Sequence, residues 1–278
     1  MIELAGQTVR AVSVGGLETC IELPNYKLCF DIGRCPPTAV RYRNVLFTHA
    51  HTDHMGGVVH HCATRDMQSM PPPTYAVPAE IAEPFSDMMA AWRRLNHTAL
   101  PHELRPVRPG DVLPLGKGRR AHVFRAIHRV PSVGYAICSE RRSLRPDLVG
   151  LPGREIQARR QAGEEITVSN DVVEVAFCGD TVIDVVDREP LVRQARLLIL
   201  EVTFLDDRVS VERARSQGHI HLDEVAARAD LFENEALLFT HRSVRYGDAE
   251  ARRLVAERLP AHLAERVTLL STLGDWQT

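Results

Sequence analysis

Residues 48–54 read THAHTDH, and the apolar run 44–47 comes immediately before them. This pattern predicts a buried strand over 45–48 that runs out into a loop, which is where open α/β sheets carry their ligands. Three histidines and one carboxylate within six positions suit zinc and related metals. His49 and His51 are two positions apart, so extended chain places both rings on one side. We interpret the stretch as the first half of a metal site. A metal-free polar loop is the alternative, because the chain holds 13 histidines in 278 residues.

The composition is that of an ordinary globular protein, with 44% apolar and 25% charged residues. It indicates neither disorder nor a membrane span. Polar residues are spread through positions 1–14, which predicts that no secretory signal is present and that the protein is cytoplasmic. Six scattered cysteines without a C-x-x-C pair indicate reduced thiols. A net charge of −2 does not indicate nucleic-acid binding over the whole surface, although a local basic patch remains compatible with it.

The first third of the chain predicts a β-meander over 8–14, 18–23 and 27–32, followed by helix 58–70, strand 74–77 and helix 79–95. Asp31 closes the third strand, where it serves either as a partner for a ligand histidine or as the cap of a turn. The apolar stripe of helix 79–95 predicts a core or dimer surface. Residues 105–115 read as a connection because proline and glycine interrupt them.

Later strands are predicted over 121–127, 135–139, 172–178, 195–200 and 235–239, with helices at 222–231 and 248–259. Strand after strand is followed by a histidine or ends in a carboxylate. Five such positions would converge on one edge if the sheets stack: His49, His128, Asp180, Glu201 and His241.

Residues 141–163 form the one segment that looks suited to phosphates. Six arginines stand there against Asp147 and Glu155, a local charge of +4; they are Arg141, Arg142, Arg145, Arg154, Arg159 and Arg160. Arginine clusters neutralise nucleic-acid backbones. A solvated arginine-rich loop explains the pattern equally well.

Six ordered motifs extend over most of the chain: THAHTDHMGG at 48–57, HRVPSVGY at 128–135, FCGDT at 177–181, EVTFLD at 201–206, GHIHL at 218–222 and THRSVRY at 240–246. Together they resemble the metallo-β-lactamase superfamily and, within it, the ribonuclease Z family of tRNA 3′-processing endonucleases. GGLETC at 15–20 and FDIGRCP at 30–36 are most similar to the short plant-type form. The resemblance implies an αββα sandwich, in which two mixed β-sheets stack face to face with helices outside. It also implies one domain over 1–278 with a short arm at about 141–163.

The resemblance also implies roles for individual residues. It assigns one zinc ion to His49, His51 and His128 and a second to Asp53, His54 and His241, with Asp180 bridging them, and Mn²⁺ is a possible substitute. Asp53 would orient or deprotonate the attacking water, and His219, paired with Glu201, would give a proton to the leaving oxygen. The implied substrate contacts are Ser243, Arg245 and Tyr246, with Arg154, Arg159 and Arg160 on the arm. The implied partners are precursor tRNA and a second copy of the chain in a homodimer.

This sequence departs from the family pattern at Thr52, at Val202 and at His221, an extra imidazole near the expected proton donor. The arm is also short, so the pattern supports the chemistry better than the substrate. One alternative is a dinuclear hydrolase acting on a small phosphodiester or ester. An alternative of another class is a non-catalytic binding or scaffold protein on the same fold.

Overall fold

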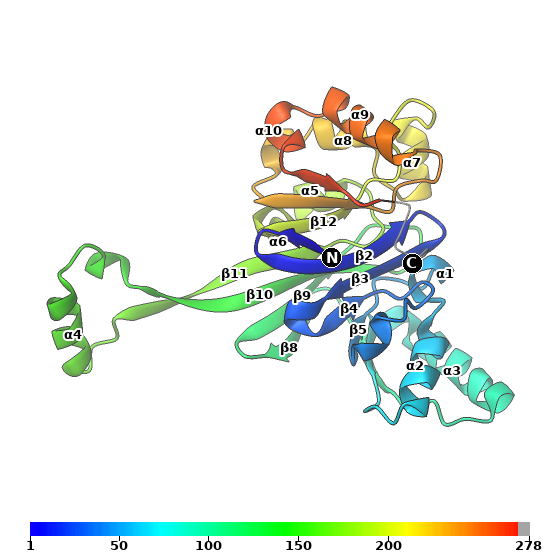
Figure 1. Ribbon diagram of the computed structural model, residues 1–278, viewed down its shortest axis with the longest axis horizontal. Coiled ribbons are helices and arrows are strands. Elements are labelled where there is room, and N and C mark those ends of the chain that lie inside the picture. Colours follow the sequence, from blue (N-terminus) through cyan, green and yellow to red (C-terminus); the bar gives the residue numbers. More distant parts are fainter. Residues whose placement is uncertain (272–278) are drawn as a thin grey trace.

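Two seven-stranded sheets stack face to face at the centre of the molecule, as seen in a computed structural model that describes residues 1–271 (Figure 1). The first sheet follows chain order: β1 (Ile2–Leu4), β2 (Gln7–Val14), β3 (Glu18–Leu23), β4 (Leu28–Phe30), β5 (Asn44–Leu46), β6 (Thr74–Pro78) and β7 (Glu103–Val107). The second has the reverse order: β14 (Val267–Leu269), β13 (Ala236–Thr240), β12 (Leu197–Glu201), β11 (Thr167–Phe177), β10 (Val133–Leu144), β9 (Arg119–Arg125) and β8 (Val112–Gly116). In each sheet, the first four strands in chain order, β1–β4 and β8–β11, are antiparallel to one another. The remaining strands, β5–β7 and β12–β14, are added in parallel.

The inner faces of the two sheets form an apolar core. Phe30 of the first sheet stacks on Tyr135 and Phe177 of the second, with ring centroids 5.8 and 5.1 Å apart. These aromatic side chains are buried together with Leu, Ile and Val residues from both sheets. Removal of this apolar area from water is the main force that holds the sheets together.

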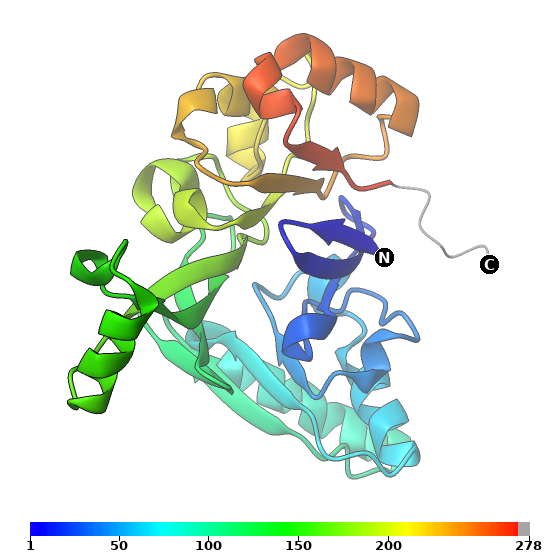
Figure 2. The same ribbon diagram turned by 60° about the vertical axis from the view of Figure 1, so that its left-hand side comes forward.

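Helices cover both outer faces (Figures 1 and 2). The first sheet is covered by α1 (Thr52–Met55), α2 (Val58–Met67) and α3 (Ala82–Asn96). Phe85 of α3 packs against Tyr75 of β6, with ring centroids 5.9 Å apart, and Met89 of α3 is buried in the same cluster. The second is covered by α5 (Asp184–Arg188), α6 (Pro190–Gln194), α7 (Val211–Gln217), α8 (Leu222–Ala226), α9 (Asp248–Arg258) and α10 (Ala261–Ala264). Short 3-10 turns lie at Pro24–Tyr26, Ala39–Arg41, Ala79–Ile81, Pro146–Leu148 and Ala229–Leu231. The αββα architecture predicted from the sequence is confirmed.

Two local predictions were wrong. Residues 105–115 are not a plain connection, because they contribute to β7 and β8, the edge strands of the two sheets. Pro106 and Pro114 are tolerated there because an edge strand leaves one row of backbone donors unpaired. The helix expected over 222–231 is α8 followed by a separate 3-10 turn.

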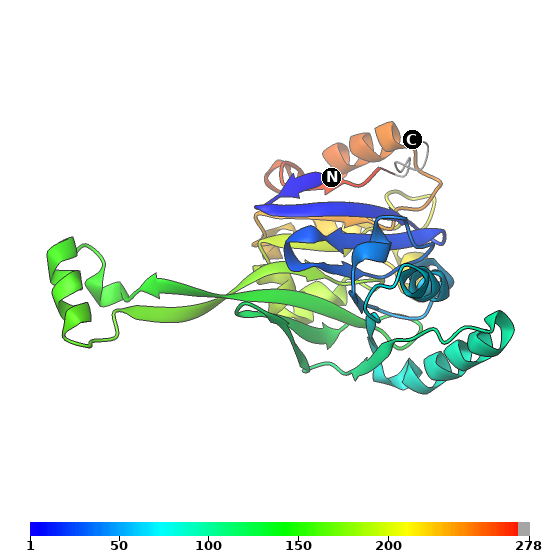
Figure 3. The ribbon, with the colours of Figure 1, turned by 60° about the horizontal axis from the view of Figure 1, so that its bottom comes forward.

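A long two-stranded arm leaves the second sheet, and the colour bar places it in the green part of the chain (Figures 1 and 3). Beyond Ser139, β10 pairs only with β11, and we call residues 140–171 the arm. Helix α4 (Gly153–Gln161) lies at its outer end. The arm is longer than the segment 141–163 expected from the sequence. Helix α4 was missed because it has no buried residue and hence no apolar stripe to reveal it.

Among residues 1–271, no helix combines the length and the apolar character needed to cross a bilayer.

Candidate metal centre

Four connections bring seven potential metal ligands to one edge of the sandwich. His49 and His51 follow β5, and Asp53 and His54 lie in α1 directly after them. The other three ligand candidates, His128, Asp180 and His241, follow β9, β11 and β13 of the second sheet. The predicted convergence of strand ends is therefore what the structure shows.

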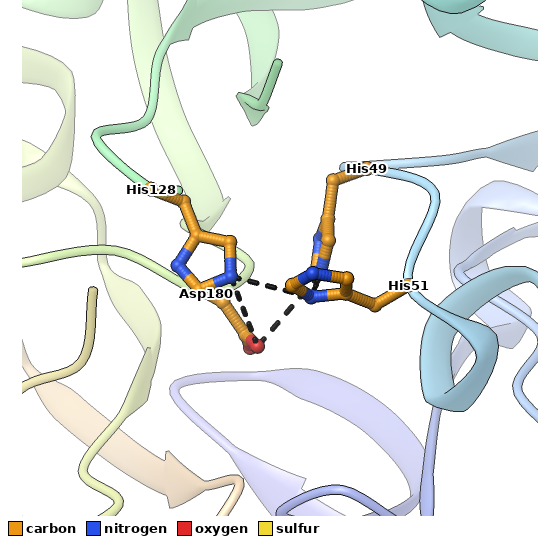
Figure 4. A group of neighbouring side chains, drawn as sticks. All are labelled: His49, His51, His128 and Asp180. Atoms are coloured by element: carbon orange, nitrogen blue, oxygen red, sulfur yellow. Dashed lines mark hydrogen bonds and ion pairs between the residues drawn. The ribbon is translucent and has the colours of Figure 1, made fainter. Parts of the chain in front are cut away.

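One group consists of His49, His51, His128 and Asp180, whose side chains point toward a common centre (Figure 4). His49 Nε2 and His128 Nε2 lie 3.0 and 3.3 Å from His51 Nδ1. Asp180 Oδ2 lies 3.8 Å from His49 Nε2 and 4.0 Å from His128 Nε2. All four side chains offer ligand atoms within 4.8 Å of one another.

A second group consists of Asp53, His54 and His241. Asp53 Oδ2 lies 3.3 Å from His241 Nε2 and 3.7 Å from His54 Nε2. The Asp180 carboxylate lies beside this group as well, because its Oδ1 is 3.3 Å from His54 Nε2 and its Oδ2 is 3.3 Å from His241 Nε2. Asp180 is therefore the one side chain shared between the two groups.

Hydrogen bonds outside the cluster orient four of the imidazoles. Asp31, fully buried, accepts from His54 Nδ1 at 2.8 Å and from the Thr48 hydroxyl, also at 2.8 Å. That hydroxyl lies 3.0 Å from His49 Nδ1, so it is placed to accept the ring proton. The Gly218 carbonyl accepts from His128 Nδ1 at 2.8 Å. Of the two interpretations of Asp31, the structure supports a partner of a candidate ligand histidine, His54.

Thr203 orients the ring of His241. Its hydroxyl donates to Glu201 Oε2 at 2.7 Å and lies 3.0 Å from His241 Nδ1, whose proton it can accept. With Nδ1 bonded outward in His49, His54, His128 and His241, each Nε2 faces the cluster. A metal bound there would take the Nε2 lone pair, while Nδ1 keeps its proton and its outward hydrogen bond.

The donor set fits divalent cations. Burial lowers the pKa of His49, His51 and His128, so these rings are neutral, as a metal ligand must be. His54 Nε2 is buried and has no hydrogen-bond partner, an arrangement that is costly unless something else satisfies the atom. Imidazole nitrogens with carboxylate oxygens are the ligands of hydrolytic zinc sites.

Charges are balanced tightly within the cluster. Burial would raise the pKa of the Asp180 carboxyl, but His241 and His54 outweigh it and hold the pKa well below its usual range. Burial would likewise lower the pKa of His54, but the carboxylates of Asp180 and Asp31 raise it. A bound cation would take the place of the additional proton that Asp180 and Asp31 stabilise on His54.

His219 and Glu201 form a pair at the edge of the cluster. His219 also belongs to a third group that could hold a metal ion, because its ligand atom and those of Asp180 and His241 lie within 4.8 Å of one another. His219 Nδ1 lies 2.9 Å from Glu201 Oε1, which also accepts from the backbone N–H groups of Thr181 and Ile220. Burial would lower the pKa of His219, but the Glu201 carboxylate raises it to about 9. The imidazole is therefore protonated at neutral pH, and its ring lines the cavity described next.

An open cavity of about 310 Å³ lies over the cluster. The predicted substrate contacts Ser243 and Arg245 line it. So do Arg129, Phe204 and Gln217, which the sequence reasoning missed. Two of them adjoin motif residues, because Arg129 follows His128 and Phe204 lies in EVTFLD, so proximity to a motif was the available signal.

Tyr246 is a correction, because the structure does not support its predicted contact with substrate. The side chain is only 1% exposed, its hydroxyl donates to Asp206 at 3.2 Å, and Arg208 covers the ring. His221 is likewise structural: it is buried, accepts from the Asp223 N–H and caps the start of α8.

The arm arginines do not join the cluster, because they lie on the arm that projects from the second sheet (Figure 1). Six carboxylates balance the six arginines over residues 140–171, so the +4 counted over 141–163 becomes zero for the whole arm. Arg159 pairs with Glu155 at 3.1 Å. Arg154 and Arg160 have no acidic partner among the described residues and remain available to a ligand.

Comparison with known proteins gives consistent results. The model of the Beta-lactamase superfamily domain matches residues 33–242. The tRNase Z TRZ1 of Arabidopsis thaliana is 39% identical over 274 residues, which cover 97% of each chain. In fold, the chain is similar to human tRNase Z, short form, with a TM-score of 0.61 and 22% identity over 95% of this chain and 96% of that one. It is also similar to the Bacillus subtilis protein YhfI, with a TM-score of 0.62 and 16% identity over 95% and 96%.

Proposed function

Because this chain belongs to the metallo-β-lactamase superfamily and, within it, to the ribonuclease Z family, we propose that it is a metal-dependent endoribonuclease that removes 3′ trailers from precursor tRNA. The observation that carries the proposal is the cluster of seven His and Asp side chains, in a chain similar to TRZ1 over nearly its whole length. A non-catalytic scaffold would not need seven oriented donors and a protonated imidazole beside an open cavity.

We propose that the two groups of donors hold two zinc ions, for which Mn²⁺ could substitute. His49, His51 and His128 would hold one, Asp53, His54 and His241 the other, and Asp180 would bridge them. When bound, a pair of divalent cations supplies acidified water and neutralises charge on a phosphodiester.

Asp53 is placed to orient the attacking water. Its Oδ2 accepts a hydrogen bond from the backbone N–H of Gly16 at 3.0 Å and lies 3.3 Å from His241 Nε2, so the carboxylate is held next to two residues that line the cavity. A carboxylate fixed by two partners can accept a hydrogen bond from water in one direction. This role is the one proposed for Asp53 in addition to metal binding.

His219 is placed to protonate the leaving oxygen. Glu201 receives hydrogen bonds on both oxygens and is only 1% exposed, so it holds the His219 ring in one orientation. With Nδ1 bound to Glu201, the proton on Nε2 is available to a ligand. An imidazolium at this position supplies a proton to an alkoxide without help from solvent.

The cavity and the arm would bind different parts of the RNA. Arg129 and Arg245 flank the cavity and have no acidic partner among residues 1–271, so they are free to pair with phosphates on either side of the scissile bond. Arg154 and Arg160 at the outer end of the arm are available to a more distant part of the tRNA. The arm would then act through unpaired guanidinium groups rather than through net charge.

We also propose that two copies associate through α3. Trp92 and Leu95 of this helix are 44% and 72% exposed, and an apolar groove of about 290 Å³ lies between α1, α2 and α3. Large apolar groups on a rigid helix are typical of protein interfaces. Trp92→Glu should give a monomer by light scattering, whereas the nearby Arg94→Glu should leave the oligomer unchanged. A cytoplasmic location is the accompanying proposal, supported by six free, buried cysteines.

The test is incubation with a precursor tRNA that carries a 3′ extension. The expected result is a product of mature length that requires metal and disappears with a chelator. No cleavage by metal-loaded, folded protein would contradict the proposal. A dinuclear hydrolase of small phosphodiesters is the second candidate, because the cavity of about 310 Å³ has the size of a small-molecule site. Hydrolysis of bis-p-nitrophenyl phosphate without tRNA cleavage would support it.

A further inference from the structure

A buried carboxylate, Glu174, marks the point where the arm leaves the body. In the pairing of β10 with β11, Ile137 faces Val175 and Cys138 faces Val173, so Glu174 is an extra residue in β11. Such a β-bulge bends a strand and increases its twist. The bulge lies three residues from Asp171, the last residue of the arm, so the geometry at Glu174 affects the direction of everything beyond it.

Side chains from three parts of the molecule meet at this carboxylate. Arg141, in the arm strand β10, donates from Nε and Nη2 to Glu174 Oε1 at 3.1 and 2.7 Å. Arg196, just before β12, donates to Oε2 at 3.1 Å. Gln7 of the first sheet lies 3.3 Å from the same oxygen. Both oxygens of Glu174 are therefore satisfied, and they link the arm to both sheets.

Burial makes the loss of this link costlier than the loss of an ordinary surface ion pair. The Glu174 side chain is 5% exposed, whereas that of Arg141 is 54% exposed. Exposed ion pairs contribute little, but a buried carboxylate depends on its donors because water cannot replace them. Arg196 is held in turn by Glu235, at 2.7 and 3.0 Å, so the body side of the link is fixed. Arg141 is the one donor that comes from the arm.

We propose that Glu174 is a positioning residue that sets the direction of the arm relative to the metal centre, acting through Arg141. The proposal rests on the proposed function, in which the arm and the cavity hold distant parts of one RNA. An RNA bound at both places requires a fixed arm direction. A small phosphodiester that occupies only the cavity does not.

A direct test measures the arm direction without any substrate. All six native cysteines are buried, so spin labels can be attached selectively at Gln157→Cys on α4 and Glu233→Cys on the body, both exposed positions. Distances between the labels are then compared in Arg141→Ala and in Arg142→Ala. These neighbouring substitutions remove the same charge, but only Arg141 bonds to Glu174. The distance distribution should broaden or shift in Arg141→Ala alone; identical distributions in both variants would overturn the proposal.

Kinetics on the same metal-loaded variants supply the second readout. If loss of the link leaves the competent arm direction populated about one tenth of the time, the apparent affinity for RNA falls about tenfold. The KM for precursor tRNA should thus rise about tenfold in Arg141→Ala, well beyond any effect in Arg142→Ala, while kcat/KM for bis-p-nitrophenyl phosphate stays the same. Glu174→Gln should reproduce this split if folded, as checked by circular dichroism.

The outcomes separate the two proposals. If the unsubstituted protein cleaves no tRNA, the proposed function fails, and the label distances still decide the role of Glu174. If both arginine variants raise KM equally with unchanged distances, Arg141 only contributes charge and the positioning role is overturned.

Discussion

Substitution of Asp31 by Asn should weaken metal binding, although Asp31 is not itself a proposed metal ligand. Asp31 accepts three hydrogen bonds, each of 2.8 Å, from the Thr48 N–H, the Thr48 hydroxyl and His54 Nδ1. An asparagine has one acceptor oxygen, so its NH₂ must face a donor in either orientation. If the NH₂ group faces the backbone N–H of Thr48, two donors oppose each other, and the backbone N–H cannot become an acceptor. If the NH₂ group instead faces His54, Nδ1 must become an acceptor and the ring proton moves to Nε2. There it occupies the lone pair that the metal needs.

The expected loss follows from that change of tautomer. Removal of a residue that orients a metal ligand typically costs about 10- to 100-fold in metal affinity, which corresponds to about 1.4 to 2.7 kcal/mol. Because Asp31 is fully buried, the upper half of this range is expected. The group that contains Asp53, His54 and His241 should lose its metal before the other group does.

The assay is a competition between the protein and a chromophoric chelator, with metal stoichiometry measured after equilibration. Asp66→Asn is the matched control, since Asp66 is an exposed residue on α2. Circular dichroism establishes that both variants fold. Wild-type affinity for two metal ions in folded Asp31→Asn would refute the reasoning about the tautomer.

Three further predictions concern catalysis, pH and packing. His219→Ala should keep its metal content but lose about 10²- to 10⁴-fold in turnover of tRNA, because the proton donor is gone; metal loss in this variant would show that His219 is a ligand. Burial raises the pKa of the Glu18 carboxyl from 4.5 to about 7, and one of its oxygens, Oε2, has no hydrogen-bond partner. The folded protein therefore binds this proton more tightly than the unfolded chain does, and its free energy of unfolding falls as the pH rises from about 4 to 7. Glu18→Gln should therefore gain up to about 3 kcal/mol in unfolding free energy at pH 8 and little at pH 4, measured by urea denaturation; equal gains at both pH values would contradict this. A Cβ on Gly33 would meet the Asp53 carbonyl at 2.2 Å, so Gly33→Ala should displace α1, destabilise the fold by about 1 to 3 kcal/mol and reduce metal content, whereas unchanged melting and metal content would contradict the contact.

Local patterns in the sequence predicted the strands that carry the site. The apolar runs before His49, Asp180 and His241 were read correctly because a buried parallel strand needs apolar side chains on both faces. The edge strands β7 and β8 were missed, since one side of an edge strand tolerates proline. Helix α4 was missed for a related reason: nothing packs on it, so no apolar periodicity is required.

The sequence by itself determined which side chains are the candidate metal ligands, because side-chain type and position at a strand end are local properties. Tertiary structure alone decided which neighbours each group has. It buried Tyr246 against Asp206 and gave His221 a capping role. It also extended the arm to residues 140–171, where Glu140, Glu164, Glu165 and Asp171 cancel the +4 counted over 141–163. It also joined Arg141 to Glu174 across two strands. The physical reason is that burial, pairing and the pKa of a side chain depend on groups that are near in space and remote in sequence.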